Sequence, residues 1–391
     1  MSGLLENGME QYKKLKVGVV CYPSYGGSGV IATELGAYLA SQGHEMHFIT
    51  SSQPVKLNVF SENIFFHEVS FNNYPLFRYD PYEIALTSKI VETVKREKLD
   101  LIHVHYALPH ASAAYFAKQI LEAEGLKLPI VTTLHGTDIT LVGKDPSFEP
   151  VITFSINGSD AVTTVSESLK TDTLQYFKVT KEVKVVSNFV CVDKYKDRKE
   201  DCNKKQFAPN GEKLLIHISN FRKVKRIQDV VRTFYEVGKK ISCKLLLIGD
   251  GPEKGGVEKL VSELGIEQSV IFTGAIKDTE TALCMADLFL LASDTESFGL
   301  VALEAMAASV PVVSTNSGGL PVVNIHGETG LLNDVGDYHQ MASNALEILK
   351  DELVHNEYKR RAFAHAELFD VSVVAPKYLE IYYSLIQSPI K

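Results

Sequence analysis

The stretch Leu288-Phe-Leu-Leu-Ala-Ser-Asp-Thr-Glu-Ser-Phe-Gly-Leu-Val-Ala-Leu-Glu304 indicates how this chain folds. Its apolar start, residues 288–292, is typical of a buried parallel strand. Small polar residues then end the apolar run, Gly299 allows a tight turn, and residues 300–308 have the composition of a helix. A strand, a loop and a helix N-terminus in this order form a cradle for phosphate, because the first amides of a helix have no partners within it.

Two carboxylates flank this cradle. Glu296 lies in the loop, and Glu304 lies about one and a half turns into the expected helix. Neither is suited to bind a phosphate, but both can accept hydrogen bonds from hydroxyl groups. Together they suit a sugar nucleotide, which combines a diphosphate with a ribose and a hexose. The alternative is two ordinary surface acids near a helix start, where the helix dipole favours negative charge.

Length and composition favour two domains. The chain has 391 residues, and 45% of them are hydrophobic, which is sufficient for two cores. The formal net charge of −8 argues against a general nucleic-acid or anionic-membrane surface. No stretch approaches the ~20 apolar residues of a membrane span, and residues 1–14 lack the apolar segment of a signal peptide. We therefore expect no nucleic-acid partner and no stable membrane insertion.

The five cysteines are too scattered to form a C-x-x-C motif. Cys21, Cys243 and Cys284 lie in or beside apolar segments and are interpreted as small buried hydrophobes. This pattern favours a reducing compartment, so the sequence predicts a cytoplasmic protein.

Apolar strands and amphipathic helices alternate along the first half of the chain, which predicts a doubly wound α/β domain with a parallel sheet. The expected strands are residues 16–22, 45–50, 64–69, 101–105, 130–134, 160–165 and 183–186. The expected helices are residues 30–41, 82–98, 109–124, 147–157 and 166–177.

A charged segment, residues 193–211, lacks apolar periodicity and is interpreted as a linker. It separates a first domain at 1–192 from a second doubly wound domain at 212–370. The strands expected in the second domain are residues 214–218, 244–248, 270–272, 288–291 and 311–314. The helices expected there are residues 226–240, 253–264, 279–285, 300–308 and 335–350.

Chemistry-bearing residues follow three strands of the first domain. Gly26 and Gly27 follow the first strand, where glycine allows backbone to approach a phosphate or sugar. His105-Tyr106 and His135-Gly-Thr-Asp138 end two later strands. Doubly wound sheets bind ligands at the carboxyl ends of their strands, which favours a site here. The alternatives are a steric need for glycine in the turn and a histidine that only packs or caps.

The basic stretch Ser219-Asn-Phe-Arg-Lys-Val-Lys-Arg226 follows the first strand of the second domain and opens a helix. Cations at a helix N-terminus are disfavoured by the helix dipole, so this stretch favours an anionic ligand. Arg222 and Lys225 are the preferred partners for a diphosphate, with Lys223 and Arg226 behind them. An exposed cation cluster without a ligand is the alternative.

Taken together and in this order, the Gly-Gly turn, His135, the basic stretch and the two glutamates resemble the retaining glycosyltransferases of family 4. The resemblance covers essentially the whole chain. It implies the GT-B fold, in which two Rossmann-like domains face a cleft and a final helix, here about 373–386, completes the first domain with residues 371–391. It also implies transfer of a sugar from a nucleotide donor without a cofactor or a metal, and the sequence lacks the D-x-D metal motif.

The resemblance also implies roles for the acidic loop. Glu304 is expected to bind the ribose hydroxyls, and Glu296 those of the hexose. Backbone amides are expected to reach the phosphate or sugar from Phe298, Gly299 and Leu300.

Further roles implied by the family concern the base and the reaction centre. Ile276, in the loop 274–277, is expected near the base, and His135 near the hexose and the reacting atoms. The arginine that the family places in the basic stretch falls on Asn220 here, which is a departure from the family pattern. Arg222 can supply the missing charge from a shifted position.

Residues 21–29, 72–78 and 219–226 resemble one branch of the family. Its members join N-acetylglucosamine from UDP-GlcNAc (UDP-N-acetylglucosamine) to the hydroxyl of L-malate, the first step of bacillithiol biosynthesis. A dicarboxylate acceptor needs cations and hydrogen-bond donors in the first domain, and the candidates are Arg78, Tyr106 and Thr137. Stacking on an aromatic ring is an equally good interpretation of Arg78.

Other functions fit the same motifs. One is a family-4 transferase with an inositol phosphate or lipid acceptor, and another is a GT-B-fold epimerase that acts on the UDP-sugar alone. A non-catalytic sensor of sugar nucleotides is a third. The sequence leaves open whether the protein forms a homo-oligomer.

Overall fold

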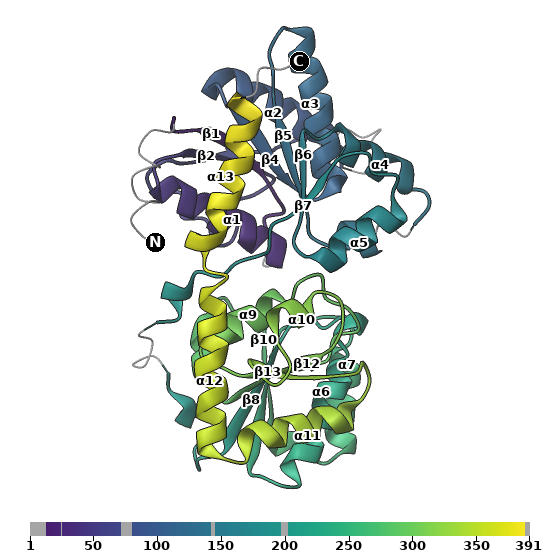
Figure 1. Ribbon diagram of the computed structural model, residues 1–391. Coiled ribbons are helices and arrows are strands. Elements are labelled where there is room, and N and C mark those ends of the chain that lie inside the picture. Colours follow the sequence, from purple (N-terminus) through teal and green to yellow (C-terminus); the bar gives the residue numbers. More distant parts are fainter. Residues whose placement is uncertain (1–12, 25, 72–79, 142–144, 197–201, 388–391) are drawn as a thin grey trace. The chain divides into compact units, whose positions relative to one another are not determined.

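The computed structural model describes residues 13–24, 26–71, 80–141, 145–196 and 202–387, which divide into two compact units. Unit 1 contains the described residues up to 165, residues 170–186 and those from 375 onward. Unit 2 contains residues 166–169 and the described residues of 187–374, including those of the segment expected to be a linker. Each unit is a parallel sheet with helices packed around it (Figure 1).

Unit 1 contains a seven-stranded sheet in the order β3-β2-β1-β4-β5-β6-β7, and all neighbouring strands pair in parallel. Every residue of the central strands β4 and β5 is buried, as expected for strands covered on both faces. The strands are β1 Lys16–Val20, β2 Glu45–Thr50, β3 Ile64–Glu68, β4 Leu101–His105, β5 Ile130–Leu134, β6 Ala161–Thr164 and β7 Val183–Val185.

The helices that follow these strands are α1 Gly27–Ser41, α2 Tyr82–Glu97, α3 Ser112–Ala123, α4 Glu149–Gly158 and α5 Glu167–Tyr176. Two short helical turns, Ala107–Ala111 and Thr137–Leu141, follow β4 and β5 directly. These turns carry the backbone away from the carboxyl ends of the two central strands.

The helix α13, Val371–Gln387, belongs to unit 1 from Ala375 onward and is drawn in yellow in Figure 1. Tyr378 and Tyr382 are fully buried there. The hydroxyl of Tyr382 lies 2.7 Å from Nδ1 of His103 in β4. Residues made late in the chain therefore complete the core around an early strand.

Unit 2 contains a six-stranded parallel sheet in the order β10-β9-β8-β11-β12-β13. The strands are β8 Lys213–Ile218, β9 Cys243–Ile248, β10 Val270–Gly274, β11 Leu288–Leu291, β12 Val312–Thr315 and β13 Gly330–Asn333. The helices are α6 Ile227–Gly238, α7 Lys254–Glu263, α8 Thr279–Cys284, α9 Leu300–Ala307, α10 Leu320–Val323, α11 Tyr338–Leu349 and α12 Glu352–Glu367.

The strand order reverses once in each sheet. The reversal lies between β1 and β4 in unit 1 and between β8 and β11 in unit 2. Ligands of doubly wound sheets bind at such switch points, beyond the carboxyl ends of the strands. The segments after β1 and β4, and those after β8 and β11, therefore hold the positions where a site is expected.

One cysteine interpretation is wrong. Cys284 is not a lone buried hydrophobe but forms a disulfide with Cys202, 82 residues earlier in the chain. The bond ties the segment that precedes β8 to the end of α8. Cys21 and Cys243 are free and buried, as the apolar sequence around them predicts.

Candidate functional site

The acidic loop of unit 2, residues 292–299, runs from β11 to α9. Gly299 has a φ of +94°, and a Cβ at this position would lie 2.6 Å from Leu320 Cδ2, so the turn requires glycine. Phe298 is buried beside it, and Leu300 begins α9. The three residues expected to offer amides therefore lie at a helix N-terminus, the geometry that proteins use for anions.

A glycine turn after β12, formed by Gly318 and Gly319, packs against the backbone of this loop. Gly318 has a φ of +59°, and a Cβ there would lie 2.1 Å from the backbone oxygen of Glu296. The amide of Gly319 donates to that same oxygen at 2.7 Å. Sequence reasoning missed this turn, although Ser317-Gly-Gly319 directly after an apolar strand was the available signal.

The carboxylate of Glu296 is held by two side chains. Its Oε1 accepts a hydrogen bond from Ser293 Oγ at 2.8 Å and forms an ion pair with Lys225 Nζ. The side chains of Glu296 and Lys225 are only 14% and 19% exposed. Because β8 and β11 are neighbours in the sheet, the structure brings the predicted cation and the predicted carboxylate together.

The other cations of the basic stretch are placed differently. The Arg226 guanidinium pairs with Asp229 and Asp294, which commits it to the start of α6. Asn220 and Arg222 are exposed just beyond β8. The exposed Arg222 can therefore reach a ligand, whereas Arg226 forms ion pairs within unit 2.

Glu304 and Ile276 come from other segments of unit 2. Glu304 is half-buried inside α9, further along the helix from the acidic loop. Ile276 is half-buried beyond β10, which β9 separates from β8 in the sheet.

In unit 1 the carboxylate of Asp138 joins the turns after β4 and β5. Its Oδ1 accepts from the amides of His135 at 3.3 Å and Gly136 at 3.0 Å. Its Oδ2 accepts from the amide of Ala107 at 3.1 Å. Burial raises the pKa of Asp138 to about 6. The sequence shows Asp138 in the motif after β5 but does not reveal this bridging role.

His135 lies against two side chains from the end of β4. Its Nε2 lies 2.8 Å from Nδ1 of His105, and its ring centroid lies 5.5 Å from that of Tyr106. Burial lowers the pKa of His135 to about 3, so its imidazole is neutral near pH 7. The structure therefore groups the predicted His135 and Tyr106 with His105, which the sequence analysis placed at a strand end without a role.

The remaining predicted residues of unit 1 are more dispersed. Gly26 and Gly27 are exposed at the N-terminus of α1. The steric need in this turn falls on Gly29 instead, where a Cβ would lie 2.6 Å from the backbone oxygen of Tyr22. Thr137 is exposed at the start of the turn after β5. Arg78 lies outside the described residues.

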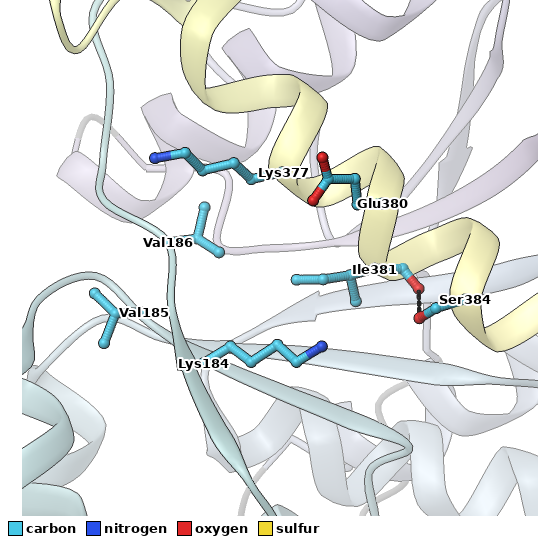
Figure 2. Close-up of a pocket in the computed structure, with 7 residues that line it drawn as sticks. All are labelled: Lys184, Val185, Val186, Lys377, Glu380, Ile381 and Ser384. Atoms are coloured by element: carbon cyan, nitrogen blue, oxygen red, sulfur yellow. Dashed lines mark hydrogen bonds between the residues drawn. The ribbon is translucent and has the colours of Figure 1, made fainter. Parts of the chain in front are cut away.

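A pocket of about 260 Å³ lies elsewhere in unit 1, between β7 and α13 (Figure 2). Its wall includes the hydroxyl of Ser384, which donates to the backbone oxygen of Ile381 at 2.7 Å. The lining residues are Lys184, Val185, Val186, Lys377, Glu380, Ile381 and Ser384. None of them is a predicted site residue.

Among the residues that the structure describes, no group of three or more His, Cys, Asp or Glu side chains is arranged to hold a metal ion. In the same part of the chain, no helix has both the length and the apolar character needed to cross a membrane.

Two protein-family models match this chain. Residues 25–194 match the family model described as Glycosyltransferase Family 4, and residues 198–365 match Glycosyl transferases group 1. The chain is 49% identical over 376 residues to N-acetyl-alpha-D-glucosaminyl L-malate synthase of Bacillus anthracis, across 96% of this chain and 98% of the relative. It is 26% identical to 2-deoxystreptamine N-acetyl-D-glucosaminyltransferase of Niallia circulans, across 92% and 98% of the two chains.

Solved structures share the fold. Anabaena Alr3699/HepE in complex with UDP and glucose matches with a TM-score of 0.80 and 21% identity, across 95% of this chain and 100% of that one. A glycosyltransferase from Rickettsia africae ESF-5 matches with a TM-score of 0.80 and 20% identity, across 97% and 100%.

Proposed function

This chain belongs to glycosyltransferase family 4, and on that basis we propose that it transfers N-acetylglucosamine from UDP-GlcNAc to the hydroxyl group of L-malate. The observation that carries the proposal is the 49% identity, over 96% of the chain, with a relative named as the synthase of N-acetyl-alpha-D-glucosaminyl L-malate. The product would enter bacillithiol biosynthesis, as the sequence resemblance implies.

Unit 2 is proposed to bind the donor. The helix N-terminus at Gly299 offers amides to the diphosphate, and Arg222 and Lys225 offset its charge without a metal. Glu296 is already oriented by Ser293 and Lys225, and it is proposed to accept from the hexose hydroxyls. Glu304 is assigned to the ribose hydroxyls and Ile276 to the base.

Unit 1 is proposed to bind malate. Arg78 would pair with a carboxylate, and Tyr106 and Thr137 would donate hydrogen bonds. His135 is assigned to the hexose and the reaction centre. Because its imidazole is neutral near pH 7, His135 is proposed to act through a hydrogen bond and not through a positive charge.

The proposed step breaks one bond and forms one. The malate hydroxyl oxygen bonds to the anomeric carbon while the bond from that carbon to the diphosphate oxygen breaks. The hydroxyl proton passes to the departing diphosphate, so UDP leaves and the sugar keeps its anomeric configuration. The residues of the enzyme then act chiefly by positioning the reactants and stabilising charge.

The test is to incubate the purified protein with UDP-GlcNAc and a panel of acceptors and to identify the products by mass and by NMR. We expect release of UDP only with malate, together with an α-linked glycoside. An inositol phosphate or lipid glycoside would replace the acceptor assignment. Conversion of the donor without any acceptor would indicate an epimerase.

The same assay tests the role of metals. We expect the rate to be unchanged in EDTA, because basic side chains and helix amides can offset the charge of the diphosphate. Loss of activity in EDTA that magnesium restores would contradict this expectation.

We also propose that the enzyme works in the cytoplasm, where UDP-sugars and malate are metabolites. In that reducing compartment Cys202 and Cys284 would be thiols. Alkylation of freshly lysed cells, followed by mass spectrometry of the two cysteines, measures their state. A fully oxidised pair in the cell would contradict a reducing compartment.

A further inference from the structure

An imidazole cluster lies at the carboxyl ends of β4 and β5 in unit 1. His103, in the middle of β4, is held on both ring nitrogens, with Tyr382 Oη at 2.7 Å and Thr133 Oγ1 at 2.7 Å. The ring of His105 packs on that of His103, with 4.3 Å between centroids, and reaches His135 through its Nδ1. His105 is fully buried. Its ring packs against His103, whose own ring is held in place by the hydrogen bonds to Tyr382 and Thr133.

The contact between His105 and His135 can hold only one proton. Burial lowers the pKa of both imidazoles far below 6.5, so both are neutral near pH 7. Each neutral ring carries one N–H and one bare nitrogen. Either His105 Nδ1–H donates to His135 Nε2, or His135 Nε2–H donates to His105 Nδ1.

The second nitrogen of His105 decides between these arrangements. His105 Nε2 is buried without a hydrogen-bond partner among the described residues. If His135 were the donor, His105 Nε2 would carry a buried N–H with nothing to accept it, which folded proteins rarely tolerate. If His105 is the donor, its Nε2 is a bare lone pair, and no donor is orphaned.

We propose that His105 is a positioning residue that donates its Nδ1–H to His135 Nε2 and thereby fixes His135 as the Nδ1–H tautomer. His135 then presents a hydrogen-bond donor, through Nδ1, to an oxygen atom of the sugar nucleotide. The backbone amide of His135, which donates to Asp138, fixes the other end of the residue. This inference rests on the proposed function, because it specifies how His135 meets the donor substrate.

Three substitutions at one position separate tautomer control from packing. In His105→Asn the side-chain amide can turn its NH2 toward His135 Nε2, so the Nδ1–H tautomer of His135 is permitted. In His105→Asp an acceptor-only carboxylate occupies the same place, so a neutral His135 must donate from Nε2 and lose its Nδ1–H. His105→Leu removes the hydrogen bond altogether. A packing role alone predicts that Asn and Asp variants of equal stability behave alike.

The direct readout is two-bond ¹H–¹⁵N correlation on histidine-labelled protein, with His135→Gln used to assign the signals. We expect wild type and His105→Asn to show a protonated Nδ1 and a bare Nε2 on His135, and His105→Asp to show the reverse. His103→Asn is the control, since it should lower thermal stability and leave the His135 signals unchanged. A protonated Nε2 on His135 in the wild-type protein would overturn the proposal.

Kinetics provide the second readout. We expect kcat of His105→Asn to stay within about threefold of wild type and kcat of His105→Asp to fall about a hundredfold, the usual cost of removing a hydrogen-bond donor from a reaction centre. Equal losses in Asn and Asp variants of matched melting temperature would also overturn the proposal. If the wild-type protein transfers no sugar, the proposed function fails while the NMR result still decides the tautomer.

Discussion

At the scale of single residues, Glu296 is held through both its backbone and its side chain. Its backbone oxygen accepts from Gly319, and its carboxylate is held by Ser293 and Lys225. A side chain that is already fixed loses little freedom when it binds a hydroxyl, which makes binding more favourable. Lys225 therefore has two proposed uses, as the partner of Glu296 and as a charge for the diphosphate.

Glu304→Ala tests the proposed ribose contact. Losing a hydrogen bond to a charged group costs roughly 1.5–3 kcal/mol, so we expect UDP-GlcNAc to bind about tenfold to a hundredfold more weakly. Isothermal titration calorimetry measures this affinity directly. Glu258→Ala, on an exposed position of α7, is the matched control and should change nothing. Unchanged donor affinity in folded Glu304→Ala would remove the assignment.

Arg78→Ala and Arg78→Lys test the acceptor. Malate carries two carboxylates, and a carboxylate that loses its partner on leaving water is costly. We expect Arg78→Ala to raise the KM for malate strongly and Arg78→Lys to raise it less, because lysine keeps the charge but not the bidentate fork. The affinity for UDP-GlcNAc should stay nearly constant. An unchanged malate KM would move the acceptor site elsewhere.

Lys225 and Glu296 are predicted site residues whose roles stay predictions, and the structure pairs their side chains. Prediction of site residues from sequence follows the order of the chain. It could not reveal that His105 meets His135, because this contact depends on the register in which β4 pairs with β5. The sequence also does not predict the Cys202–Cys284 bond, because the two cysteines are 82 residues apart and the sequence does not show that the fold brings them together.

At the scale of elements, the glycine turn after β12 packs directly against the backbone of the acidic loop after β11 and fixes its position. Gly318→Ala would place a methyl group about where the Glu296 oxygen lies, on a backbone with φ of +59°. We expect a loss of roughly 1–3 kcal/mol in the stability of unit 2, from strain of this kind, and weaker donor binding. Thermal melting and donor titration measure the two effects.

Gly255→Ala in α7 is the matched control for that substitution. This glycine has open space around its Cβ position and lies inside a helix. Alanine should therefore stabilise unit 2 by about 0.5–1 kcal/mol. If Gly318→Ala and Gly255→Ala shifted the melting temperature alike, the claim that the glycine turn fixes the acidic loop would be contradicted.

The sequence predicts the long periodic elements and also short strands such as β7 and β11, but it does not predict every short element. The strand β13 has four residues, Gly330–Asn333, and was not expected, because so short a run with a polar end shows no clear period. The helix expected from residue 335 begins at Tyr338 instead. Asp337 caps it by accepting from the amide of Gln340, and this capping residue was a usable signal.

At the scale of the whole molecule, the two units should respond differently to acid. Burial lowers the pKa of seven histidines in unit 1, to about 4 or about 3 where a value is resolved, and of three histidines in unit 2. Those of unit 1 are His44, His47, His67, His103, His105, His110 and His135. Those of unit 2 are His217, His355 and His365.

A histidine that is neutral when folded takes up a proton when it unfolds below about pH 6.5. Its stabilising contribution is therefore complete above pH 6.5 and is lost as the pH falls toward 3–4. Asp138, with a pKa raised to about 6, acts in the opposite direction between pH 3.8 and 6 but is a single group. We expect unit 1 to lose stability first on acidification. Hydrogen exchange followed by mass spectrometry at pH 7 and pH 5.5 resolves the units, and equal loss of protection in both would contradict the expectation.

The position of α13 has a consequence for biosynthesis. Tyr382, which contacts His103, lies 279 residues further along the chain, and the whole of unit 2 lies between them. A ribosome therefore finishes unit 2 before it makes the helix that covers β4. The N-terminal sheet must wait with this face uncovered while the later unit folds, so this nascent chain should engage chaperones through its first half and complete that half last.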